Sequence, residues 1–140
     1  MRSIRGVRAK HIATTLAAVP AAFLLTVAPA QAAGSTTVVY TSDGGSTMAG
    51  KAIFWGGYDK EAFQVCDTES DGMRVWAHWS WNGGSVTLSD ADGSSAFCDD
   101  KPAHIARKQV PEGATVEITV CRRDGANGVK KDCGFNYGKA

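Results

Sequence analysis

The residues able to carry acid–base chemistry are few in this chain of 140 residues. Beyond the first quarter of the sequence there are two histidines, His78 and His104, and His78 lies two positions before Ser80. A histidine beside a serine hydroxyl and an aspartate is the arrangement by which a hydrolase activates its nucleophile. The sequence has neither the G-x-S-x-G nor the H-E-x-x-H pattern. We therefore expect no catalytic residue and no enzyme activity.

A possible metal loop begins at Asp90. The segment Asp90-Ala-Asp-Gly-Ser-Ser95 opens like a calcium loop, but its glycine comes two positions early and the twelfth residue is Lys101 instead of glutamate. Asp99 and Asp100 could add oxygen ligands. Asp-Gly turns between strands need no metal, however, so we predict no metal ion and no cofactor.

Aromatic side chains are the third candidate for chemistry, here for binding. Trp55 and Tyr58 flank a Gly-Gly turn, and Trp76 begins the run Trp-Ala-His-Trp-Ser-Trp. Exposed planar rings stack on sugars and serve as anchors at protein interfaces. The alternative is that the tryptophans fill the core of a small domain.

The first 32 residues decide where this chemistry takes place. Arg2, Arg5, Arg8 and Lys10 precede an apolar run that ends in Pro-Ala-Gln-Ala, with small residues where a signal peptidase cuts. This order is typical of a secretory signal peptide, and we place cleavage after Ala32. The apolar run is short and contains a proline, so a membrane anchor is the weaker interpretation. The expected mature domain is 33–140, a secreted, extracellular protein.

The composition of the mature part excludes a basic binding surface. Loss of the four signal-peptide cations leaves 11 Lys and Arg against 14 Asp and Glu, a net charge of −3. The remaining charges alternate in sign, so neither nucleic acid nor a membrane is an expected partner. A length of 108 residues suits one domain, and we expect a monomer.

Four cysteines lie in the mature part, and they predict two disulfides. Of the three possible pairings we favour Cys66–Cys98 with Cys121–Cys133. If 126–128 is a hairpin loop, Cys121 faces Cys133 at a Cα distance of ~4.5–5.5 Å, which a disulfide tolerates. A two-residue Asn-Gly turn would place Cys121 opposite Gly134 instead. A zinc site is disfavoured because no C-x₂₋₄-C pair is present.

Short apolar stretches separated by Gly, Asp, Asn and Ser predict an all-β fold. Period-2 alternation places Val75, Ala77 and Trp79 on one face of the longest strand and Trp76 and His78 on the other. The same alternation puts the cysteines off the core face, so the bridges should clip neighbouring segments. We predict an antiparallel β-sandwich, with a Greek-key-like or barrel-like arrangement as the alternative. The expected strands are 36–41, 51–55, 61–66, 73–81, 85–89, 96–98, 103–108, 114–123 and 129–135.

One segment resembles a known group of proteins. The stretch Phe63-Gln-Val-Cys-Asp-Thr-Glu-Ser-Asp-Gly-Met-Arg-Val-Trp-Ala77 is similar to small, uncharacterised secreted actinobacterial proteins in which V-C-D-x-x-x-D-G runs into a long strand. The stretch 110–124 and the final Cys133 fit the same outline. The resemblance implies secretion, a β-sandwich and paired cysteines, and it brings no activity.

Three functions follow as hypotheses. The first is non-enzymatic binding of an extracellular protein or polysaccharide. The second is inhibition of a protease or glycosidase, with Arg122 and Arg123 in an exposed loop beside a disulfide as the bait, because a stapled loop loses little entropy on binding. The third is carbohydrate binding through Trp55, Tyr58 and Trp76.

Overall fold

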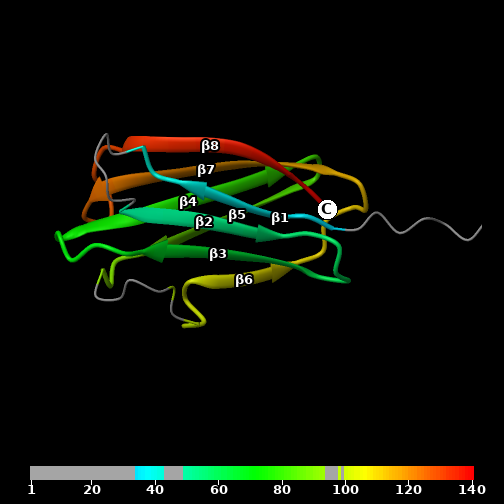
Figure 1. Cartoon of the computed structure of the whole chain (residues 1–140), viewed down its shortest axis with the longest axis horizontal. Helices are drawn as coiled ribbons and strands as arrows, with labels where there is room; N and C mark the ends of the chain where they lie inside the picture. Colours follow the sequence, from blue (N-terminus) through cyan, green and yellow to red (C-terminus); the bar gives the residue numbers. More distant parts are fainter. Residues whose placement is uncertain (1–33, 43–48, 94–97, 99) are drawn as a thin grey trace, which may run out of the picture.

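Two four-stranded antiparallel sheets form the protein (Figure 1). The structure is a computed structural model, which describes residues 34–42, 49–93, 98 and 100–140. The first sheet has the strand order β1-β2-β3-β6 and the second has the order β5-β4-β7-β8. The strands are β1 (Thr36–Tyr40), β2 (Gly50–Trp55), β3 (Glu61–Asp67), β4 (Met73–Trp81), β5 (Gly84–Asp90), β6 (Ile105–Lys108), β7 (Thr115–Asp124) and β8 (Lys131–Lys139). The predicted antiparallel β-sandwich is confirmed.

The alternation of the sequence decides which side chains enter the core. On β4, Val75, Ala77 and Trp79 are buried, while Trp76 and His78 lie on the outer face. The hairpin to β5 turns tightly at Asn82-Gly83, between the expected strands 73–81 and 85–89, and Gly83 has a φ of 100° that favours glycine.

Phe63 of β3 joins the two sheets. Its ring lies 5.3 Å from that of Phe54 in the first sheet and 5.7 Å from those of Trp79 and Trp81 in the second. Phe54, Phe63 and Trp79 are fully buried. Burial of a side chain of this size contributes roughly 1.5–3 kcal/mol to the stability of the fold. This aromatic packing therefore stabilises the contact between the two sheets.

Both predicted disulfides are present. Cys121–Cys133 links the neighbouring strands β7 and β8, and Cys66–Cys98 links β3 to the segment before β6. The predicted register of the last hairpin holds at Val120↔Gly134, after which an irregularity shifts Arg122 onto Lys131. The sulfur atoms lie outside the main core cluster, as expected for bridges between neighbouring segments.

The last strand is longer than predicted. It continues past Phe135 to Lys139, because Gly134 and Gly138 let β8 pack closely on the first sheet. A Cβ at Gly134 would lie 1.9 Å from the Tyr40 carbonyl oxygen, and one at Gly138 would lie 2.6 Å from the Phe54 ring. Gly134 and Gly138 are therefore sites of close approach and not turn residues.

Two predictions fall outside the described residues. These are the signal peptide over residues 1–32 and most of the expected strand 96–98. In the described ranges, no helix is long and apolar enough to span a membrane.

We predict that the two disulfides stabilise the fold unequally. Cys66–Cys98 spans 32 residues and Cys121–Cys133 spans 12, while Cys66 and Cys121 are almost equally buried. The longer loop loses more entropy in the unfolded chain, so removing the first bridge should cost about 4 kcal/mol and removing the second about 3 kcal/mol. Urea titration of the paired Cys→Ala variants measures both values. A larger loss from the shorter loop would contradict the prediction.

Candidate functional site

Trp55 and Tyr58, predicted from the sequence as binding residues, line one hollow on the outer face of the first sheet. The hollow has a volume of about 370 Å³. Its floor comes from facing positions on β3 and β6, because Ala62 pairs with Arg107 and Gln64 pairs with Ile105. We call this the aromatic hollow, lined by Trp55, Tyr58, Ala62, Gln64, Asp100, Ile105 and Arg107.

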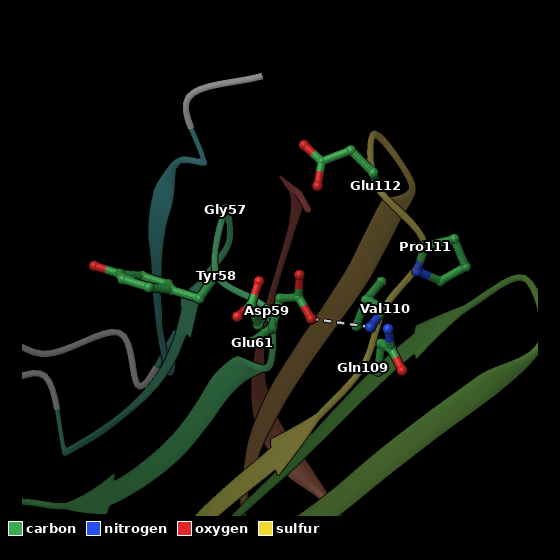
Figure 2. A pocket seen from close by; sticks show the side chains of 8 residues that line it. All are labelled: Gly57, Tyr58, Asp59, Glu61, Gln109, Val110, Pro111 and Glu112. Atoms are coloured by element: carbon green, nitrogen blue, oxygen red, sulfur yellow. Dashed lines mark hydrogen bonds between the residues drawn. The ribbon is translucent and has the colours of Figure 1, made fainter. Parts of the chain in front are cut away.

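A second hollow adjoins the first and shares Tyr58 with it. This acidic hollow has a volume of about 570 Å³, and its main lining residues are Tyr58, Asp59, Glu61, Gln109 and Glu112. Figure 2 shows the two sides of the opening, the turn at Gly57 and the segment from Gln109 to Glu112. The Tyr58 ring is directed away from that segment, and Tyr58 is 63% exposed.

Glu61 connects the two sides of the acidic hollow. It is the first residue of β3 and shares the inner face of that strand with Phe63 and Val65, so its side chain is almost fully buried. Its Oε2 accepts a hydrogen bond of 2.9 Å from the Val110 backbone N–H (Figure 2). A buried carboxylate needs such a partner, and here the bond ties β3 to the segment between β6 and β7.

The third predicted binding aromatic, Trp76, lies on the other sheet. The Lys130 ammonium nitrogen is 3.3 Å from the centre of the Trp76 ring, a cation–π contact. The His78 ring is parallel to it within 8° at a centroid distance of 5.8 Å. Trp76 therefore takes no part in the aromatic hollow, and Lys130 already occupies a position against its ring.

Arg122 and Arg123 lie within β7 and not in an exposed loop, so the expected bait arrangement is wrong. The Arg122 guanidinium binds the Asp71 carboxylate and is 3.6 Å from Glu69 and 3.8 Å from Asp132. Arg123 pairs with Arg74 across the β4–β7 ladder. An inhibitory loop must be extended and accessible, whereas these arginines belong to a paired strand.

His78 lies on the second sheet and His104 just before β6 of the first, and neither lines the aromatic or the acidic hollow. His78 Nδ1 is 2.8 Å from Thr87 Oγ1 on the outer face of the second sheet, where its other facing residue is Thr119. Ser80 faces Glu117 and Ser85 on the same face. His104 is buried at the opposite end of β3 from Glu61, with Nε2 3.4 Å from Asp90 Oδ1. The geometry described does not assemble a serine, a histidine and an aspartate in one place.

Asp67 and Asp90 form a buried polar cluster with His104. By strand alternation both aspartates point between the sheets, Asp67 in line with Phe63 and Val65, and Asp90 opposite Val75. Asp90 Oδ2 accepts a 2.9 Å bond from the Asp67 N–H, and Oδ1 accepts one of the same length from the Asp92 N–H. The segment expected to be a simple turn thus sends one aspartate into the interior.

The pKa of Asp67 is raised from its ordinary value of 3.8 to about 6. Burial is the main cause, and the negative charges of Asp90 and Asp71 act in the same direction. A hydrogen bond from the Glu69 N–H to Oδ1 and the charge of Arg122 act against the shift. Asp71 also accepts a bond from the Met73 N–H, so aspartate side chains brace this turn at both ends.

Sequence reasoning missed Glu61, Asp59, Glu112 and Asp67 as site residues. A signal for two of them was present: Glu61 and Asp67 occupy the same alternating positions as Phe63 and Val65, so a regular strand must bury them. No comparable signal joins the Gly57 turn to the segment 109–112, because the two are distant in sequence.

We predict that Asp67→Asn stabilises the protein at pH 7 and has no effect at pH 4. The folded state keeps the Asp67 proton up to about pH 6, whereas the unfolded chain loses it near 3.8. The stabilising contribution of the protonated carboxyl is complete below pH 4 and is lost as the pH rises through 6. Asparagine carries no charge to bury, so the gain at pH 7 should be on the order of 1–3 kcal/mol.

Urea unfolding at both pH values, in buffer containing EDTA, measures this difference. The exposed Asp124→Asn is the control. Its difference in stability from the wild type should be the same at pH 4 and pH 7. Equal stability of Asp67→Asn and the wild type at pH 7 would contradict the prediction.

Comparisons with known proteins add no assignment: no family model matches this chain, and searches of curated proteins and of solved structures find no match. The function is therefore inferred from the residues and the geometry described above.

Proposed function

We propose that the chain is an exported binding protein, not an enzyme, whose ligand is a polysaccharide held at the aromatic and acidic hollows. One observation carries the proposal: Trp55 and Tyr58 line a single hollow, which adjoins a second hollow bearing three carboxylates. Binding sites combine apolar contact area with a few placed polar groups, and the two hollows supply both.

The side chains suit a sugar chain. The exposed Tyr58 ring offers a flat apolar face at the border of the two hollows, and Trp55 adds a second ring beside it. Asp59 and Glu112 accept hydrogen bonds from hydroxyl groups, and Gln109 can both donate and accept them. Because the carboxylates repel anions, a neutral or cationic polysaccharide fits better than an acidic one.

Binding is favoured over catalysis because the candidate catalytic groups either do not line the hollows or are already hydrogen-bonded within the protein. The buried Glu61 carboxylate is engaged by the Val110 N–H. His104 lies near Asp90 at the far end of β3, and His78 stacks on Trp76 on the other sheet. A general acid–base mechanism needs such groups within hydrogen-bond reach of the reacting atoms.

Export is supported by independent features. The first 32 residues have the order of a signal peptide, and both pairs of cysteines are joined as disulfides, which persist in oxidising compartments. The resemblance of the segment 63–77 to small secreted actinobacterial proteins points the same way.

We predict that expression with the native leader in a secreting bacterial host yields a protein that begins at Ala33. Intact-mass spectrometry should give the mass of residues 33–140 less four hydrogens, because two disulfides form outside the cytosol. An uncut chain in the cell fraction, or four thiols that react with an alkylating reagent, would refute export.

We predict that the protein binds a neutral or amino-sugar polysaccharide and that Tyr58→Ala weakens this binding at least tenfold. Truncation removes the exposed ring on which the sugar stacks. Isothermal titration with soluble glucans, xylan, chitosan oligosaccharides and polygalacturonate measures the affinities. Trp55→Ala should weaken binding in the same titrations.

The matched control is Tyr137→Ala. Tyr137 is 56% exposed, close to the value for Tyr58, but it lies on β8 of the other sheet. It should bind as the wild type does. The proposal fails if no polysaccharide of this panel binds, if only the anionic one binds, or if Tyr137→Ala and Tyr58→Ala lose affinity equally.

A further inference from the structure

Three side chains at the end of the sandwich opposite the acidic hollow could hold one cation. Asp90, Asp92 and His104 each offer a ligand atom, and these three atoms lie within 4.8 Å of one another. Two ligands of a tetrahedral ion at about 2.1 Å are roughly 3.4 Å apart, so small side-chain movements would bring the three atoms to a common ion. Asp90 and His104 are buried, which places most of this group in the interior.

A carboxylate oxygen of the neighbouring Asp67 has no hydrogen-bond partner among the described residues. Asp67 is only 5% exposed, and its Oδ2 has no hydrogen-bond donor in the described part of the chain. The Asp67 side chain points between the sheets, and its backbone N–H donates to Asp90 Oδ2, so the two residues are direct neighbours in the interior. An unpaired buried carboxylate oxygen is costly, and a bound cation would compensate it.

The hydrogen bonds that Asp90 already makes are compatible with a metal. Each carboxylate oxygen has two acceptor sites, and each oxygen of Asp90 accepts one backbone N–H, from Asp67 and from Asp92. Metal-binding carboxylates are themselves held by such second contacts, which fix their direction. Asp90 is therefore oriented by backbone amides and keeps an acceptor site on each oxygen.

We propose that Asp90, Asp92 and His104 bind one divalent transition-metal ion next to the buried Asp67, with Zn²⁺ as the favoured ion. Imidazole nitrogen and carboxylate oxygen are both zinc ligands, and three such donors with one water complete a tetrahedral site. Calcium is disfavoured because it takes six to eight oxygens. The ion would tie β5 and the residues after it to the segment before β6. This proposal replaces the prediction of no metal from the sequence, and it is independent of sugar binding.

Lys101 competes with a metal ion for the Asp92 carboxylate. Its ammonium group pairs with the Asp92 carboxylate at the half-exposed edge of the group. Zinc would have to displace that ammonium from Asp92, whereas in the absence of metal the lysine neutralises part of the negative charge. Removing the lysine charge should therefore tighten metal binding, while removing the Asp92 charge should weaken it.

Isothermal titration of the chelator-stripped protein with ZnCl₂ tests the site. We expect one Zn²⁺ per chain, association at least tenfold weaker in Asp92→Asn and His104→Asn, and no weakening in Lys101→Gln. Asp92→Asn is the decisive variant because Asp92 is exposed and its substitution leaves the core intact. Lys101→Gln breaks the same ion pair but keeps the carboxylate, so it separates loss of a ligand from loss of the pair.

His78→Asn is the control for adventitious binding by a histidine, since His78 lies on the outer face of the other sheet. It should bind zinc as the wild type does. Zn²⁺ should also raise the melting temperature of the wild type and not that of Asp92→Asn. The proposal is overturned if the wild type binds no Zn²⁺, if Asp92→Asn binds it as the wild type does, or if His78→Asn removes the binding.

Discussion

The packing of Phe63 between the sheets is the contact on which the rest of the structure depends. Because Phe63 must face Trp79 and Trp81, the inner face of β3 is fixed, and the residues two and four positions away face inward with it. Those positions include Glu61 at one end of the strand and Asp67 at the other. One aromatic contact between the sheets thus places a buried carboxylate at each end of the core.

The two carboxylates have different surroundings, and this difference separates their roles. Glu61 receives the Val110 N–H, so its burial is compensated by a bond that also forms one wall of the acidic hollow. Among the described residues, the Asp67 carboxylate accepts a hydrogen bond only from the Glu69 N–H, on one oxygen, and it faces the negative charge of Asp90. The first arrangement is complete within the chain, whereas the second lacks a positive partner at Oδ2. A proton or a metal ion would supply it.

The sequence predicts those features that depend on local alternation. The buried face of β4 and the hairpin between β4 and β5 follow from a period of two and a turn length, and the structure has them. The Cys121–Cys133 bond is also present, but the predicted loop 126–128 is wrong, because β7 and β8 are joined by residues 125–130 and the register shifts after Val120. The hollows and the aspartate–histidine group depend on how one sheet or connection lies against another, which alternation does not determine. Glu61 and Asp67 were visible as charges on a core face, but their partners Val110 and Asp90 were not.

The aromatic side chains on the outer faces of the two sheets differ in their contacts and exposure. This difference decides where a ligand can bind. Lys130 lies against the Trp76 ring, so stacking there would first have to displace a favourable cation–π contact. Tyr58 is more exposed and stands at the border of two hollows whose walls are held by β-ladder pairing and by the Glu61–Val110 bond. A wall that is already ordered loses little entropy when a ligand binds. The rigid end of β3 with the satisfied carboxylate is therefore the better place for a sugar, and the end with the unsatisfied carboxylate is the better place for an ion.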